Sequence, residues 1–186
     1  TALQIVTMSN LYFECFRLNK PDSSFLFLNQ AIELSKKHSK SYNLSNLYRF
    51  MSGRFRTIND SDSAILFLNK SYEIDLKNSN LRGQAAYFKL FSEILYEQKK
   101  YKSSLKMVEK AIELTNKFNA GIGDASLLFY KYNLYKELGD TKNALLNYEL
   151  HNELKDTLEK LSADEEIVKI QYNQEYEIKK QLDSLK

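Results

Sequence analysis

The sequence predicts an all-α fold in which helical hairpins stack into a solenoid, and three observations support this prediction. The 186-residue chain has one Pro and five Gly and is rich in Leu, Lys, Glu and Asn, a composition that favours helix over strand. The sequence repeats at intervals of 40 residues. Within each repeat, two apolar series with helical spacing are separated by a short break.

The repeat is clearest in the second half of each unit. Residues 24–34 (SFLFLNQAIEL) correspond to residues 64–74 (AILFLNKSYEI), and residues 104–114 and 144–154 follow at the same interval. Two positions seven residues apart are mostly small in every unit: Ser24, Ala64, Ser104 and Ala144, then Ala31, Ser71, Ala111 and His151. Positions seven apart share a helix face, so small residues there predict close packing against a neighbouring helix.

The first half of each unit carries larger apolar residues, also seven apart. They are Met8, Tyr48, Phe88 and Leu128, then Cys15, Phe55, Leu95 and Tyr135. Short breaks at 19–21, 59–61, 99–100 and 139–141 separate the two halves. Gly139 suits a left-handed helix end, Asp60 and Asp140 suit N-caps, and Pro21 suits a first helical turn. Each unit is therefore predicted to be a helical hairpin.

This pattern resembles the tetratricopeptide (TPR) repeat. The fourth unit carries Leu128, Tyr132, Tyr135, Gly139, Ala144, Tyr148 and Leu154 at the characteristic positions, and the third carries Phe88, Leu95, Tyr101, Ser104, Val108, Ala111 and Leu114. The resemblance covers residues 2–156. The period of 40 exceeds the usual value of about 34, and the terminal Pro of the motif is absent. We expect the extra residues to lengthen the helices or the connections near 37–41, 77–82 and 118–124.

Two segments follow from this division. Residues 1–156 form a TPR-like solenoid with units at about 5–40, 41–80, 81–120 and 121–156, and no evident cap precedes the first, so further units are expected before Thr1. Residues 157–186 form a charged helical extension or coiled-coil-like connector. One possibility is that the last helix continues from Thr141 to about Leu185. The other is that it ends before Ser162 and a new helix starts at the capping box from Ser162 to Glu165. The extension could cap the solenoid, pair with a second copy in a homodimer, or lead to another domain.

The end of the array carries a finer resemblance, to the TPR sensor region of bacterial membrane-tethered regulators. It rests on Tyr132, Leu134, Tyr135, Leu138, Gly139, Asp140, Ala144, Tyr148, Leu154 and Asp156, and on Glu175, Tyr176, Glu177, Lys179 and Lys180 in the charged helix. In that family a membrane span and then a histidine kinase or helix-turn-helix output domain follow. The resemblance implies a periplasmic sensor or scaffold. The alternative is a cytoplasmic adaptor, or a segment of a peptide-responsive transcription regulator, with no membrane link.

The TPR resemblance also implies a binding face for a protein or peptide, because first helices line the concave surface of such arrays. The repeat register places twelve residues there: Phe13, Phe16, Arg17, Arg49, Gly53, Arg56, Lys89, Glu93, Tyr96, Phe129, Asn133 and Lys136. We expect a mixed face with a basic bias that could engage carboxylates. The carboxylate clamp of chaperone-binding TPR proteins is not expected, because Gly53 and Glu93 stand where that subgroup has Asn.

Other functional classes find little support in the sequence. Two histidines, His38 and His151, and a lone Cys15 suggest neither a metal set nor a nucleophile pair, so we expect no catalytic residue, metal or cofactor. A net charge of +3 does not indicate nucleic-acid binding. No apolar run approaches the roughly 20 residues of a membrane span.

Overall fold

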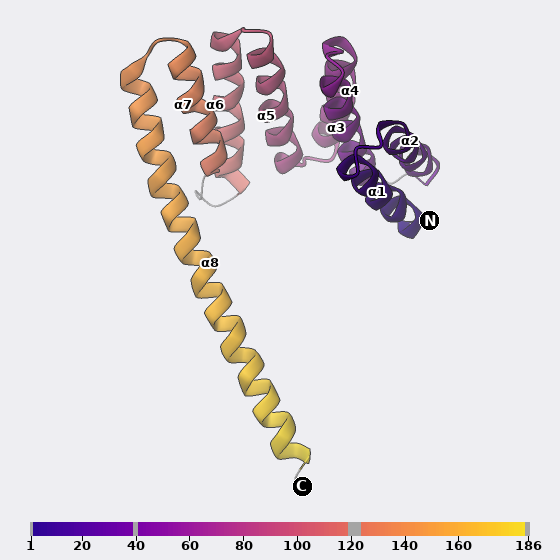
Figure 1. The fold of residues 1–186 in the computed structure, drawn as a ribbon, viewed down its shortest axis with the longest axis vertical. Helices are drawn as coiled ribbons and strands as arrows, with labels where there is room; N and C mark the ends of the chain where they lie inside the picture. Colours follow the sequence, from indigo (N-terminus) through magenta and orange to yellow (C-terminus); the bar gives the residue numbers. More distant parts are fainter. Residues whose placement is uncertain (1, 39–40, 119–123, 185–186) are drawn as a thin grey trace.

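The described residues form eight helices and no strand in the computed structural model (Figure 1). The model describes the backbone of residues 2–38, 41–118 and 124–184, and their side chains except 41–43, 165 and 167–184. The helices are α1 (Ala2–Arg17), α2 (Pro21–Lys37), α3 (Ser41–Thr57), α4 (Ser61–Lys77), α5 (Leu81–Glu97), α6 (Tyr101–Phe118), α7 (Ala125–Glu137) and α8 (Thr141–Ser184). They pair as hairpins, and each second helix packs on the first helix of the next unit. The predicted all-α, TPR-like solenoid is confirmed.

The turn inside every hairpin has the same backbone geometry. The residue two positions after the first helix has a positive φ in all four units: Asn19, Asn59, Lys99 and Gly139. In each turn the next backbone N–H donates to a carbonyl five residues earlier, as in the 2.9 Å bond from Asp140 to Tyr135. Only Gly139 adopts this conformation without steric strain. The predicted left-handed helix end at Gly139 is confirmed.

The predicted helix starts are also confirmed. The Asp60 carboxylate accepts the Ser63 backbone N–H at 3.0 Å, and the Asp140 carboxylate accepts that of Asn143 at 3.1 Å. Each satisfies a donor that has no partner within its own helix. Pro21 is the first residue of α2, where its missing N–H is harmless.

The small residues of the second helices have equivalent environments. Ser24, Ala64, Ser104 and Ala144 are all buried. The Ser104 hydroxyl donates to the Ser92 carbonyl across its own hairpin at 2.7 Å, which illustrates how closely the two helices approach. The predicted packing positions are confirmed for these four residues and for Ala31, Ser71 and Ala111, which are also buried, whereas His151 is only partly buried.

The first helices bury a stripe that lies partly outside the predicted one. Tyr48 and Leu95 of the predicted series are buried, but the most buried side chains include their neighbours Leu47 and Ile94. The reason is that a first helix packs both on its own partner and on the preceding unit. The centre of its buried face therefore lies between these two contacts.

The last helix settles the alternative left open by the sequence. α8 is continuous over 44 residues, so no new helix starts at Ser162. At 1.5 Å per residue it is about 66 Å long. Its first part packs on α7, and the remainder projects from the solenoid (Figure 1). The charged series from Glu175 to Lys180 lies outside the described side chains.

Candidate partner-binding face

Charged and polar side chains on the first helices bridge one unit to the next. We call the surface that they share on α1, α3, α5 and α7 the first-helix face. Arg56 of α3 forms ion pairs of 2.6 Å with both Glu93 and Glu97 of α5. Tyr96 of α5 donates to Glu137 of α7 at 3.3 Å. The first-helix face is therefore continuous across units two, three and four.

The ionisation of these groups reflects the contacts. Burial acts to lower the pKa of Arg56, but hydrogen bonds to Glu97 and Glu93 raise it overall, so the guanidinium stays charged. Burial and the nearby Glu137 carboxylate raise the pKa of the Tyr96 phenol. Tyr96 therefore stays a neutral hydrogen-bond donor at physiological pH.

Lys89, in the middle of α5, forms an equivalent bridge to α7. Its ammonium donates to the Ser126 hydroxyl at 2.8 Å and lies 3.9 Å from the Asp124 carboxylate. Asp124 also caps α7 by accepting the Ser126 backbone N–H at 2.8 Å. Lys89 thus contacts the first turn of α7 through two side chains.

Arg49 is held inside the fold, unlike the other predicted cations. Its side chain is 11% exposed and lies 2.5 Å from the Asp75 carboxylate, which is 1% exposed. The same guanidinium nitrogen also donates to the hydroxyls of Ser45 and Ser71, and the second nitrogen donates to Asn46. The donors of Arg49 are used by the protein itself, so Arg49 does not form part of the open surface.

These contacts correct the expected basic bias. Arg49, Arg56 and Lys89 each have a carboxylate within 4 Å. Among the described residues Lys136 has no ion pair, and its ammonium lies 5.2 Å from the centre of the Tyr132 ring. The first-helix face is consequently a network of paired charges. Sequence reasoning missed Glu97 and Glu137, although each recurs at the 40-residue interval directly after a predicted site residue.

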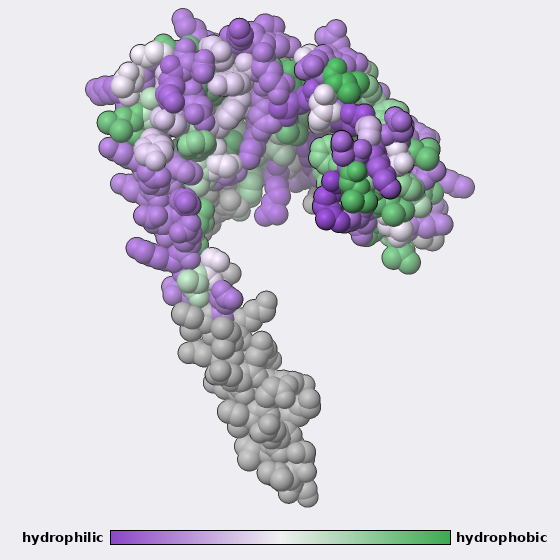
Figure 2. Space-filling model, in the orientation of Figure 1, coloured by the Kyte–Doolittle hydropathy of each residue, from purple (hydrophilic) through white to green (hydrophobic). Residues whose placement is uncertain are grey.

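Three predicted aromatic residues are exposed on this face. Phe13 is 46% exposed, Phe16 53% and Phe129 42%. The Phe13 ring packs edge-on against Phe50 of α3, with the two ring centres 4.8 Å apart, and it also packs against the ring of Tyr12. Figure 2 shows hydrophobic residues gathered at the end of the molecule that α1 and α2 form. This end of the first-helix face is apolar, in contrast to the charged network on α3, α5 and α7.

Gly53 lies on α3 one helical turn after Phe50, in the repeat register of Phe13. A Cβ added at Gly53 would meet no atom of another element within 4 Å, and its φ is not positive. The fold therefore does not require glycine here, although glycine inside a helix lowers stability by about 0.5–1 kcal/mol relative to alanine. Gly53 therefore leaves open space on α3, one helical turn from Phe50, which contacts Phe13.

The remaining predicted site residues take part in local contacts. Arg17 is exposed and pairs with Glu14 of its own helix at 2.7 Å. The Asn133 side chain donates to the Phe129 carbonyl one turn earlier at 3.1 Å. Both leave part of their side chains on the surface of α1 and α7.

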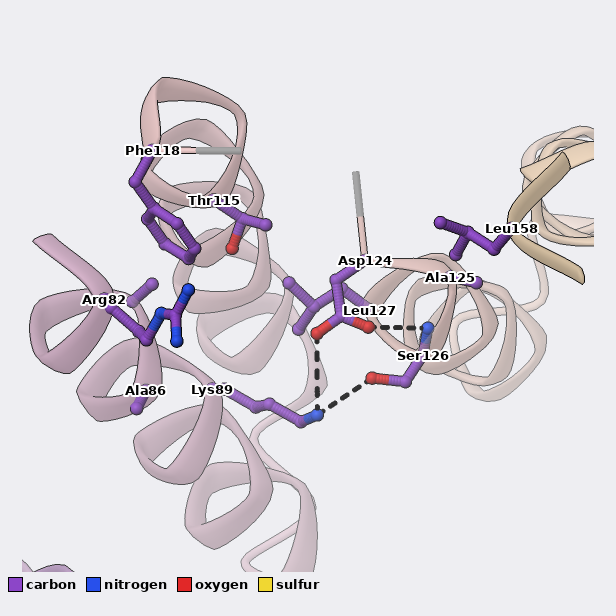
Figure 3. A pocket seen from close by; sticks show the side chains of 11 residues that line it. Arg82, Ala86, Lys89, Thr115, Phe118, Asp124, Ala125, Ser126, Leu127 and Leu158 are labelled. Carbon is purple, nitrogen blue, oxygen red and sulfur yellow. Dashed lines mark hydrogen bonds and ion pairs between the residues drawn. The ribbon is translucent and has the colours of Figure 1, made fainter. Parts of the chain in front are cut away.

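A pocket lies between units three and four (Figure 3). It has a volume of about 590 Å³, and its lining comes from four helices and the α7 N-cap: Arg82, Ala85, Ala86, Lys89, Thr115, Phe118, Asp124, Ala125, Ser126, Leu127 and Leu158. Lys89 is the one predicted site residue in this lining. Sequence reasoning missed Arg82 and Thr115, because only packing of separate helices brings them together.

Two further classes of feature are absent from the part of the chain that the structure describes. There, no three His, Cys, Asp or Glu side chains cluster as metal ligands would. None of the described helices has the length and apolarity to cross a membrane. Cys15 is a partly buried free thiol, and the His151 ring donates a 2.8 Å hydrogen bond from Nδ1 to the Ala125 carbonyl.

These observations define a helical-repeat protein whose first-helix face carries paired charged groups. Its fold is TPR-like, as comparison with solved structures shows. One similar structure is BtubC (BKLC) from P. vanneervenii, with a TM-score of 0.72 and 13% sequence identity over 83% of this chain and 64% of that one. Another is the apo form of RapI, with a TM-score of 0.74 and 14% identity over 84% of this chain and 57% of that one. A STAND signal-transduction ATPase with a tetratricopeptide repeat sensor, from Pyrococcus horikoshii, matches over 81% of this chain and 23% of its own length, with a TM-score of 0.69 and 15% identity.

The chain therefore spans less than two thirds of the length of each of these structures. No family model matches the sequence, and no curated protein matches it. The likeness concerns the fold alone.

Proposed function

We propose that this chain is a non-enzymatic interaction module that binds a protein or peptide along the first-helix face. The observation that carries this proposal is that exposed Phe13 packs on Phe50, one helical turn before Gly53, where the fold leaves open space and does not need glycine. Aromatic residues are typical anchors at protein interfaces. Gly53 lets the partner backbone approach α3 closely.

The charged network gives the partner a second set of contacts. Arg56 is already neutralised by Glu93 and Glu97, and the Glu97 side chain is 51% exposed. A partner therefore gains little by presenting carboxylates to Arg56. We propose a partner segment with an apolar anchor for the Phe13 end and hydrogen-bond donors or a basic group for Glu97 and Glu137.

The test uses the full 186-residue chain and a random dodecapeptide display library. Selected peptides are measured by fluorescence anisotropy against the parent protein, Phe13→Ala, Gly53→Ala and the control Leu66→Ala. Leu66 is similarly exposed but lies on α4, a second helix. We expect Phe13→Ala to weaken binding about tenfold and Leu66→Ala to leave it unchanged. Equal effects of both substitutions would refute the proposed face.

Gly53→Ala gives the sharper result, because binding and stability should move in opposite directions. The added methyl fits the fold and removes the helix penalty of glycine, so the free energy of unfolding should rise by about 0.5–1 kcal/mol. The same methyl occupies the open space at Gly53, so peptide affinity should fall. Unchanged affinity would show that the partner does not approach α3 at this point.

We further propose that the module is the sensor or scaffold part of a bacterial signal-transduction regulator. Its support is the 44-residue α8, which leaves the solenoid and could carry a signal or pair with a second copy. The alternative is a cytoplasmic TPR adaptor, or a segment of a peptide-responsive transcription regulator, with no membrane link. The flanking gene sequence distinguishes them: a signal peptide upstream and an apolar span soon after Lys186 support the first, and their absence from the parent gene supports the second.

A further inference from the structure

The pocket of Figure 3 lies at the start of α7, which differs from the start of the other first helices. α3 begins at Ser41 and α5 at Leu81, but α7 begins at Ala125, four positions later in the repeat register. α7 is correspondingly short, with 13 residues where α3 and α5 have 17. The pocket lies beside this start of α7, between α7, α5 and α6.

The pocket wall is mostly apolar. Ala85 and Ala86 of α5, Leu127 of α7 and Leu158 of α8 supply small and branched side chains, and Phe118 closes one side. A volume of about 590 Å³ lies within the range of small-ligand pockets, which is about 300–1,000 Å³. The pocket can therefore hold a compact apolar group.

Two cationic side chains converge on this apolar space. Arg82 lies with its guanidinium carbon 5.4 Å from the centre of the Phe118 ring, and its charged end points into the pocket (Figure 3). Among the described residues no carboxylate lies within 4 Å of Arg82. Lys89, about two helical turns after Arg82 on α5, also reaches the pocket, and the Thr115 hydroxyl faces the pocket from α6 (Figure 3).

The charges define the ligand. Arg82 and Lys89 contribute two positive charges and Asp124 one negative charge, so the lining has a net charge of +1. This charge fits a monoanion, and the apolar walls disfavour a strongly hydrated dianion such as phosphate. The planar guanidinium of Arg82 matches a carboxylate in geometry as well as in charge.

We infer that this pocket binds a carboxylate attached to a compact apolar group. Such a ligand is either a free organic acid or the C-terminal residue of a peptide. The carboxylate lies between Arg82 and Lys89, and the apolar group packs on Leu127 and Leu158. This site is separate from the Phe13 end of the first-helix face, and Leu158 of α8 is part of its lining. Its ligand therefore contacts α5, α6 and α7 of the solenoid and also Leu158 of α8.

Two matched pairs of probes test this inference on the ¹⁵N-labelled 186-residue chain. The first pair is 4-methylpentanoate and its amide, and the second is the tripeptide Gly-Gly-Leu and its C-terminal amide. Chemical-shift titrations follow backbone amides of Ala85, Thr115 and Leu127 as reporters of the pocket, and of Phe13 and Gly53 as reporters of the first-helix face. We expect saturable shifts in the pocket reporters for the carboxylates only.

The variants Arg82→Gln and Lys89→Gln identify the groups that bind the carboxylate. We expect each to weaken binding about tenfold, which corresponds to the loss of one charge-assisted hydrogen bond. Arg17→Gln is the matched control, because Arg17 is exposed on α1 and does not line the pocket. Thermal melting of each variant checks that the fold is retained. If a Gln variant melts early, Arg82→Lys keeps the charge and should retain part of the affinity.

Every outcome bears on the proposal. Binding by both carboxylates supports a site for free acids, and binding by the tripeptide acid alone supports a site for peptide C-termini. Equal binding of acids and amides, equal binding by Arg82→Gln and the parent, or no shift in the pocket reporters overturns it. Shifts confined to Phe13 and Gly53 would overturn this inference and leave the proposed first-helix face intact.

Discussion

Gly83 of α5 leaves the space that the carboxylate of Asp75 fills. A Cβ built on Gly83 would lie 2.2 Å from the Cγ of Asp75, far closer than two such atoms can approach. Asn80 joins the two residues: its amide donates to Asp75 at 2.8 Å, and its carbonyl oxygen accepts the Gly83 backbone N–H at 3.1 Å. Arg49 binds the other carboxylate oxygen of Asp75, Oδ2. Units two and three are thus locked by a polar cluster inside their interface.

Replacing Gly83 with Ala should separate the two units at this point. The added methyl must displace the buried Asp75 or the start of α5, and overpacking of this kind typically destabilises by about 1–3 kcal/mol. Urea denaturation measures the change. Gly53→Ala is the matched control, since the same substitution there meets open space. A Gly83→Ala variant as stable as the parent would show that Asp75 moves aside without strain.

Replacing Arg49 with Met should leave the Asp75 carboxylate buried without its charge partner. Removing one member of a buried ion pair typically destabilises by about 3–5 kcal/mol. The melting temperature should fall clearly, whereas Arg17→Met, which removes an exposed pair with Glu14, should leave it unchanged. If Arg49→Met melts like the parent and loses only partner binding, then Arg49 belongs to the binding face after all.

Replacing Ala144 with Leu should disturb the packing of α8 on α7. Ala144 is buried, so the larger side chain should destabilise the protein by about 1–3 kcal/mol. Leu146→Ala lies on the exposed side of the same helix and serves as the control. Differential scanning calorimetry of the two variants should show a lower melting temperature for Ala144→Leu alone.

The helix caps predict how stability depends on pH. The Asn143 side chain and backbone N–H lower the pKa of Asp140, and those of Ser63 lower the pKa of Asp60. Because the folded-state pKa is depressed, the stabilisation is complete above the ordinary carboxyl value of 3.8 and is lost as pH falls through the lower folded value. Asp140→Asn keeps a cap acceptor that does not titrate. Its stability should therefore fall less than that of the parent between pH 5 and pH 2, as urea midpoints would show, and equal loss would contradict the assignment.

Local sequence features specified the fold because the repeat is a short-range signal. The left-handed turn at Gly139, the caps at Asp60 and Asp140 and the buried Ala64 each depend on a few neighbouring residues. Repetition at 40 residues then requires equivalent environments in successive units. The hairpins and their stacking were therefore predictable. The continuous α8 was one of two alternatives. It was possible because no Gly or Pro lies between Leu161 and Ile167 to interrupt the helix.

The identity of each surface charge's partner was decided only by the tertiary structure. The repeat register placed Arg49, Arg56 and Lys89 on one surface, but it could not show that Asp75 is buried beside Arg49 or that Glu97 reaches Arg56. Ion pairs between helices depend on the angle and distance at which units pack, and residues 22 to 41 positions apart carry no local signal of that geometry. The pocket beside Arg82 has the same origin. The sequence by itself determined which residues form helices and which faces they bury, and packing determined which charged groups remain open to a partner.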